Sequence, residues 1–221
     1  MKHGATVDIR SYLPPPEWFG RWWDPAELLV SVRDHNEHVP SELLFTRPEL
    51  KPLLEAHAAA RFAAIRGQDL QCSIRLATER FPDFELRIQH QLQQFELTEA
   101  DHDGRKRGDE YREAAKRKVA GLQPDVELIS PDDEERDALS AIARAIERKA
   151  AKRYAPPPPH LLVYVNFSLF RELRLKRLDV LQLVEPWTGR FASIWLLWGA
   201  NALRCWPNPA HIVDRDPMRG F

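Results

Sequence analysis

Two periods of apolar residues divide the first half of the chain. Over residues 48–66, apolar side chains recur every three to four positions, which predicts a helix with one buried side. Over residues 71–77 and 82–99, apolar and polar side chains instead alternate, and the polar stretch at 89–91 interrupts the second run. Strict alternation predicts half-buried strands, so these residues are expected to form three consecutive strands in an antiparallel meander.

The second half of the chain alternates between helical patterns and fully apolar runs. A helix is predicted from Pro131 to about Tyr154, because acidic residues begin the segment and basic residues end it, as the helix dipole favours. Residues 161–165 and 191–198 are continuous apolar runs, which indicate strands buried on both faces. Residues 168–184 have a mostly helical pattern, and the tail after Pro207 is predicted to be a loop. This order predicts an α/β protein with a mixed central sheet flanked by helices.

The first 40 residues have no sustained period and are predicted to be irregular. Pro14-Pro15-Pro16 favours an extended chain, and four aromatic residues follow it: Trp18, Phe19, Trp22 and Trp23. We therefore divide the chain into an aromatic and proline-rich arm, residues 1–40, and a single α/β domain, residues 41–221. The arm is expected to pack on the domain, although a surface that binds a peptide or stacks on nucleic-acid bases is an alternative.

Composition narrows the class of protein but not its function. Hydrophobic residues make up 43% and charged residues 29% of the 221 positions, which suits a folded domain with a real core. The net charge is −1, so the chain as a whole lacks the basic excess of a dedicated nucleic-acid binder. The first ten residues lack the apolar core of a signal peptide, and the longest apolar runs are too short to span a bilayer. We expect a cytoplasmic protein with no membrane partner.

Two carboxylates on the predicted meander are the candidate chemistry. Pro82-Asp83 opens the second strand-like run, and Glu96-Leu97-Thr98 lies in the third, with Glu96 13 residues after Asp83. Alternation places both carboxylates on the polar faces of neighbouring strands, where they can share one cleft. Two hard oxygen ligands suit Mg²⁺, which binds phosphate and activates water at a phosphodiester.

These residues and the element order resemble the PD-(D/E)XK nuclease superfamily. In that superfamily the second strand supplies an Asp, often after Pro, and the third supplies an acid, a spacer and a Lys. The resemblance covers roughly residues 48–120 and implies a restriction-endonuclease-like core, a Mg²⁺ cofactor and cleavage of DNA. It implies that Asp83 and Glu96 are catalytic metal ligands. Glu55, on the preceding helix, would add a third carboxylate, as first-helix acids do in some such nucleases.

The chain departs from the family pattern at Thr98, where the family has its Lys. Some relatives take that Lys from a neighbouring helix or strand, and the nearest lysine after the predicted strand is Lys106. We therefore assign Lys106 as the relocated catalytic lysine, and the run Arg105-Lys106-Arg107 as the candidate contact to nucleic-acid phosphates.

Less specific interpretations compete with this assignment. Asp83 suits a turn after Pro82, Glu96 suits a solvated strand face, and the basic run suits a solvated loop. The missing Lys and the near-neutral charge favour a second hypothesis, a catalytically inactive nuclease-like fold that binds nucleic acid or protein. A third is an interaction protein without nuclease ancestry that uses its aromatic arm. No GxxxxGK[ST], GxGxxG, GxSxG, HExxH or CxxC motif supports another chemistry.

Overall fold

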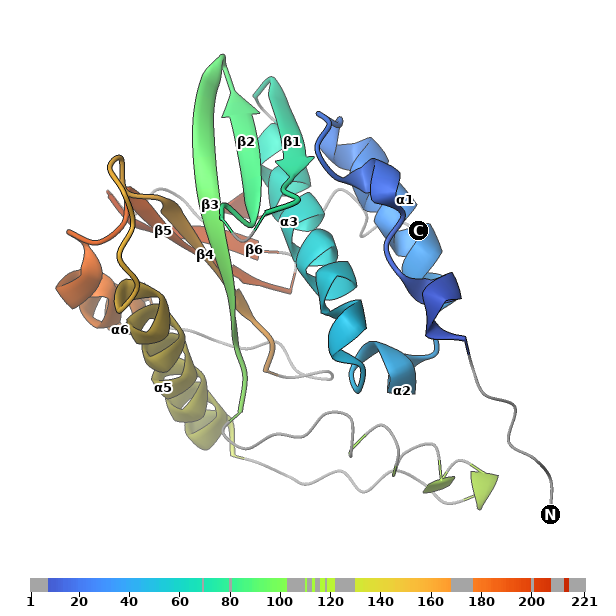
Figure 1. Ribbon diagram of the computed structural model, residues 1–221. Coiled ribbons are helices and arrows are strands. Elements are labelled where there is room, and N and C mark those ends of the chain that lie inside the picture. Colours follow the sequence, from blue (N-terminus) through green and yellow to red (C-terminus); the bar gives the residue numbers. More distant parts are fainter. Residues whose placement is uncertain are drawn as a thin grey trace.

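One mixed sheet organises the fold, and its seven strands are neighbours in the same order as along the chain (Figure 1). The first three strands form an antiparallel meander, and β4 and β5 run parallel to β3. Strand β6 is antiparallel to β5, and β7 is antiparallel to β6. The computed structural model describes residues 8–68, 70–79, 81–102, 110, 113, 116–117, 119–121, 130–167, 177–199, 201–207 and 213–214. The strands are β1 (Cys72–Leu76), β2 (Phe84–Ile88), β3 (Gln91–Ala100), β4 (His160–Val165), β5 (Ser193–Trp198), β6 (Asn201–Trp206) and β7 (Val213–Asp214).

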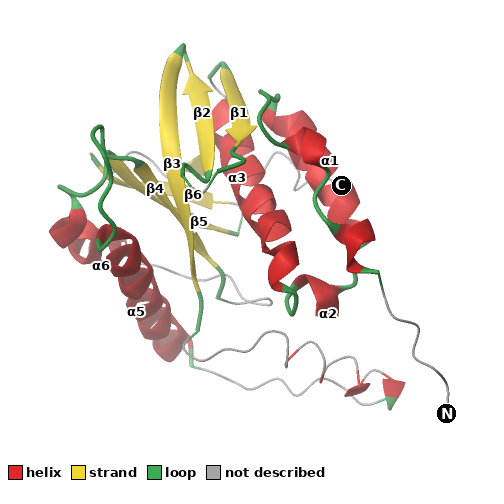
Figure 2. Ribbon diagram, in the orientation of Figure 1, coloured by secondary structure: helices red, strands yellow, loops and turns green. Residues whose placement is uncertain are grey.

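Helices cover both faces of this sheet, which confirms the predicted α/β class with a mixed, helix-flanked sheet (Figure 2). One face packs on α1 (Pro25–Glu37), α2 (Ser41–Leu44) and α3 (Lys51–Gly67), and the other on α5 (Pro131–Ala150) and α6 (Arg177–Val184). Short 3-10 turns complete the described elements: Ile9–Tyr12, Pro16–Trp18, Pro48–Leu50 and Glu185–Trp187. Each face of the sheet therefore has its own apolar layer, one centred on Phe62 of α3 and one on Ile142 of α5.

The meander forms where alternation predicted it. Gln89 and His90 connect β2 to β3 with positive φ angles of 47° and 69°, as a two-residue hairpin turn requires. This turn sets a register in which Phe84 pairs with Phe95, and their rings stack with centroids 4.8 Å apart. The register matters for function because it also fixes how residues flanking the Phe pair face each other.

Helix α5 brings its basic end to the sheet. Ser130 caps the first turn by accepting a hydrogen bond from the Asp133 amide, and acidic residues occupy that turn. The helix ends at Ala150, four residues before the predicted end at Tyr154, and packs on β3. Its last turn and the residues that follow it therefore lie against the polar side chains of β3.

The N-terminal arm packs on the domain, as its aromatic residues predicted. Trp18 is 2% exposed, and its indole Nε1 donates to Ser31 Oγ at 3.0 Å. The backbone amides of Gly20 and Trp23 donate to Leu76 and Ile74 at 2.9 and 2.8 Å, so the arm extends the sheet beyond β1.

Three predictions about local structure need correction. Residues 25–37 are not irregular but form α1, because Asp24 caps the helix and three apolar residues of it are buried: Leu28, Leu29 and Val32. The tail is not all loop, because Val213–Asp214 pairs with β6. Strand β6 itself was not predicted. Of the segment 168–184, which was predicted to be mostly helical, Arg177–Val184 forms helix α6, and residues 168–176 lie outside the described residues.

Candidate functional site

Asp83 ties the start of β2 to the middle of β3. Its backbone amide donates to the Phe95 carbonyl at 2.9 Å, and its carboxylate Oδ2 accepts from the Leu97 amide at 2.6 Å. The side chain therefore lies across the strand that carries Glu96. Asp83 does follow Pro82 as a turn residue would, but these bonds also hold its carboxylate beside that neighbouring strand.

Glu96 is buried, so the interpretation of a solvated strand face is wrong. It is 1% exposed, because the end of α5 and the residues after it cover this side of β3. Its Oε2 accepts from Lys149 Nζ at 2.5 Å, from Lys152 Nζ at 3.2 Å and from the Tyr154 hydroxyl at 3.2 Å. A buried carboxylate with charged donors is costly to desolvate, and such groups are common at functional sites.

Lys149 joins the two carboxylates into one cluster. Its Nζ lies 2.5 Å from Glu96 Oε2 and 3.3 Å from Asp83 Oδ2, and its side chain is 15% exposed. Asp83 and Glu96 therefore share one lysine amine as a common partner. The lysine comes from the last turn of α5 instead of the loop after β3. Arg105, Lys106 and Arg107 lie outside the described residues.

The sequence contained a signal for Lys149 that we interpreted differently. Lys149 and Lys152 are three residues apart in the basic end of the predicted helix, and we ascribed that end to the helix dipole. In a helix that continued to Tyr154, as predicted, residues at that spacing would lie on one face, so both ammonium groups could reach one acceptor. Which acceptor they reach depends on how α5 packs, which the sequence pattern does not specify.

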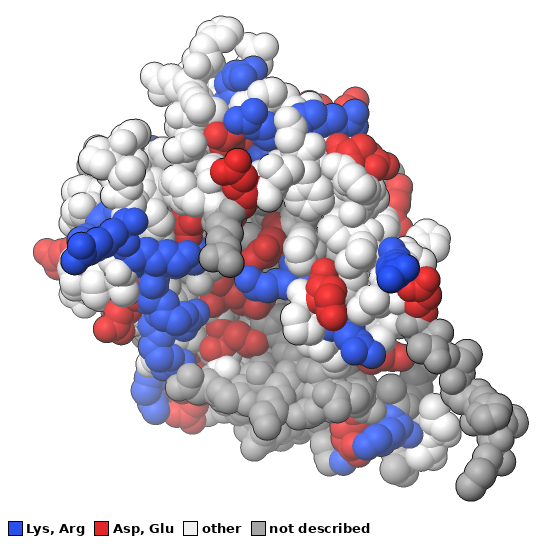
Figure 3. Space-filling model, viewed as in Figure 1, with Lys and Arg blue, Asp and Glu red and all other residues white. Residues whose placement is uncertain are grey.

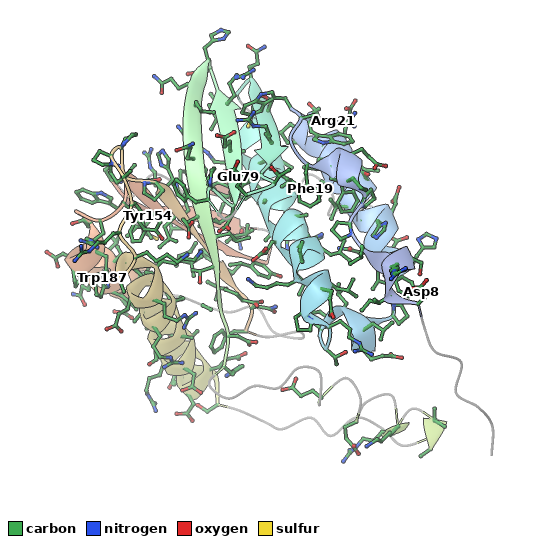
Figure 4. The ribbon with its side chains drawn as sticks, viewed as in Figure 1. Asp8, Phe19, Arg21, Glu79, Tyr154 and Trp187 are labelled. Atoms are coloured by element: carbon green, nitrogen blue, oxygen red, sulfur yellow. The ribbon has the colours of Figure 1, made fainter. Side chains whose placement is uncertain are left out.

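Glu55 lies near the cluster, but its carboxylate forms an ion pair with a residue outside the cluster. Its carboxylate pairs with Lys51 Nζ at 2.7 Å, one turn earlier on α3. Glu55 and Asp83 line the same pocket, about 450 Å³ in volume, between the arm, α3 and the end of β1. Figure 4 shows two other lining residues, Phe19 and Glu79, on the opposite side of β3 from Tyr154. Within the described part of the chain, no three His, Cys, Asp or Glu side chains are grouped so as to hold a metal ion.

Burial and neighbouring charges set the electrostatics of the cluster. Burial raises the pKa of Asp83, the Lys149 ammonium and the Leu97 amide oppose that rise, and the charges of Glu96 and Glu55 add to it. Burial, together with the Glu96 carboxylate, also raises the pKa of Tyr154. In Figure 3, acidic and basic side chains are interspersed over the middle of the face shown. The site is therefore a compensated cluster of charges, without one dominant sign.

The residues that could hold a hard divalent cation are Asp83 and Glu96, because Mg²⁺ prefers carboxylate oxygens. Within the described residues, the hydrogen bonds to Asp83 and Glu96 that define the cluster reach one oxygen of each, Oδ2 and Oε2. The second oxygens, Asp83 Oδ1 and Glu96 Oε1, take no part in these bonds. Mg²⁺ is usually bound through one or two carboxylates and keeps several waters, so two protein ligands suffice.

No family model, curated protein or solved structure matches this chain. In the part of the chain that the structure describes, no helix is both long and apolar enough to cross a membrane. The functional argument therefore rests on the geometry of Asp83, Glu96 and Lys149.

Proposed function

We propose that this protein is a metal-dependent phosphodiesterase of the PD-(D/E)XK type that acts on DNA. The contact of Lys149 Nζ with both Asp83 Oδ2 and Glu96 Oε2 carries the proposal. Two carboxylates on neighbouring strands and one lysine amine are the groups that this chemistry needs, and they come from three separate parts of the chain.

Asp83 and Glu96 would hold the cation, and their roles follow from their surroundings. Asp83 is fixed by the Leu97 amide, and Glu96 by the Lys152 and Tyr154 donors, so neither carboxylate has to reorganise to bind. A bound Mg²⁺ would supply a Lewis acid and lower the pKa of its water. Burial of the carboxylates strengthens their attraction for a cation, because less water screens it.

Lys149 supplies the positive charge that Thr98 does not. The ammonium group lies beside both metal ligands, where the scissile phosphate would approach. There it can donate to a phosphate oxygen and stabilise the charge that develops during phosphodiester cleavage. Lys152 is more exposed, at 52% of its side chain, and its Nζ pairs with Glu96 Oε2 at 3.2 Å, so it serves mainly to hold Glu96.

One observation favours a second candidate, an inactive nuclease-like fold that binds nucleic acid or protein. The ammonium groups of Lys149 and Lys152 already balance the charges of Asp83 and Glu96. In that case the lysines are permanent counter-ions and the cluster is structural. The two candidates differ in whether Asp83 is needed for cleavage or only for folding.

Nicking of supercoiled plasmid DNA with Mg²⁺ or Mn²⁺ distinguishes them. We expect cleavage by the wild type and its loss in Asp83→Asn and Glu96→Gln. We expect Lys149→Met to be slower by at least about 100-fold, the effect of removing one charge-stabilising donor. Glu99→Gln is the matched control, because Glu99 lies on the same strand but alternation directs it to the other face. Absence of nicking in the wild type, or equal nicking by Asp83→Asn, would refute the proposal.

A further inference from the structure

The sheet face that carries the cluster continues beyond it along the meander. Asp83, Glu85 and Arg87 alternate along β2 and so share this face, and Arg75 of β1 pairs with Glu85 across the strands. At about 3.4 Å per residue, Arg87 lies roughly 14 Å along the strand from Asp83. Residues on one face of a sheet can contact the same extended ligand.

A tryptophan from the N-terminal arm supports the arginines on this face. The guanidinium carbon of Arg87 lies 4.1 Å from the centroid of the Trp22 ring, and that of Arg75 lies 5.0 Å from it. Trp22 is held there because its neighbour Trp23 exchanges backbone hydrogen bonds with Ile74 of β1. The ring thus restricts the Arg87 side chain, which lowers the entropy lost when that side chain binds a ligand.

The two arginines differ in what already neutralises them. Arg75 donates through Nε to Glu85 Oε2 at 2.6 Å and also pairs with that carboxylate through Nη2. Arg87 is exposed, and no acidic partner is found for it in the described part of the chain. Opposite Arg87 on β3, Leu92 is 55% exposed. The face therefore presents one uncompensated guanidinium between an aromatic ring and an apolar side chain.

We propose that this surface, formed by Trp22, Arg87 and Leu92, binds the backbone of the DNA strand that enters the cluster. A planar guanidinium matches the oxygens of a phosphate, and the apolar groups beside it suit sugars and bases. The 14 Å offset corresponds to about four base-pair steps of duplex DNA at 3.4 Å each. The choice of DNA as the ligand rests on the proposed function. This surface lies on the same sheet face as the cluster and would contact the substrate away from the scissile bond.

Binding without cleavage tests this surface separately from the chemistry. The probe is a fluorescein-labelled 20-bp DNA duplex, and anisotropy is measured with EDTA present over a series of salt concentrations, in the wild type and in Arg87→Ala. We expect Arg87→Ala to weaken binding at least fivefold at low salt and to lower the slope of log K against log salt by about 0.9. Trp22→Ala should weaken binding in the same direction. Arg47→Ala is the control, because Arg47 is also exposed but lies between α2 and α3, on the other side of the sheet.

The outcomes separate failure of this surface from failure of the proposed function. Loss of affinity in Arg87→Ala but not in Arg47→Ala supports the surface, whether or not the plasmid assay detects nicking. Equal affinity of Arg87→Ala and the wild type overturns it, even if the wild type nicks DNA. No binding of the duplex by the wild type also overturns it. Circular dichroism of each variant confirms folding, and Arg87→Lys should recover part of the affinity.

Discussion

Replacing Lys149 with Met should destabilise the protein, because the substitution leaves a buried carboxylate with weaker partners. Glu96 is 1% exposed and loses its shortest contact, 2.5 Å, while Asp83 loses its ion pair. Removing one partner of a fully buried pair costs roughly 3–5 kcal/mol. Since Lys152 and Tyr154 still donate to Glu96, we expect a loss of about 2–3 kcal/mol, or a Tm lower by roughly 4–12 °C for a chain of this size.

A double-mutant cycle measured by urea denaturation checks this reasoning. In Glu96→Gln/Lys149→Met the carboxylate is absent, so the loss of Lys149 should cost at least about 1 kcal/mol less than in the wild type. Lys152→Met is the matched control, and because the Lys152 side chain is 52% exposed we expect it to cost under about 1 kcal/mol. Additive effects in the cycle, or equal costs for the two lysines, would refute the view that Lys149 is the main counter-charge of a buried cluster.

Other parts of the molecule give three further tests. Trp18→Ala should lower the free energy of unfolding by about 3–5 kcal/mol in chemical denaturation, because Trp18 is 2% exposed. Trp22→Ala should cost far less, and equal losses would contradict our account of the arm. Burial, helped by the Arg66 charge, lowers the pKa of His160 to about 4. Between pH 4 and 6.5 the unfolded chain therefore binds the proton more readily than the folded chain. The free energy of unfolding should rise with pH across that window by up to about 3 kcal/mol. His160→Gln should remove most of this rise, and an unchanged pH profile would show that His160 is not its source. Burial raises the pKa of the Cys72 thiol to about 11, so iodoacetamide at pH 8 should alkylate native protein far more slowly than unfolded protein; equal rates would contradict this.

The sequence predicted the position of the two carboxylates because that position depends on local rules. Alternation assigned Asp83 and Glu96 to the same side of neighbouring strands, and a tight turn at Gln89 and His90 fixed the register between them. Both rules act over a few residues. The burial of Glu96 was not predictable in the same way, because it depends on what covers the strand.

The lysine and several elements were missed because tertiary packing decides them. Lys149 lies 53 residues beyond Glu96, and only the docking of α5 on β3 brings them together. Helix α1 has few buried apolar residues, so its period was too weak to recognise. Strand β6 is short, and its Asn201–Trp206 segment falls between the predicted strand at 191–198 and the predicted loop after Pro207, where we assigned no element.

Titration of the protein with Mn²⁺ in a calorimeter tests the central claim most directly, namely that Asp83 and Glu96 jointly bind one divalent cation. We predict a single binding event in the wild type, its loss in both Asp83→Asn and Glu96→Gln, and its retention in Glu99→Gln. Mg²⁺ should compete for the same site, since both ions prefer oxygen ligands. Absence of binding heat in the wild type, or equal heats in the wild type and Asp83→Asn, would contradict the account and leave Lys149 as the permanent counter-ion of a structural cluster.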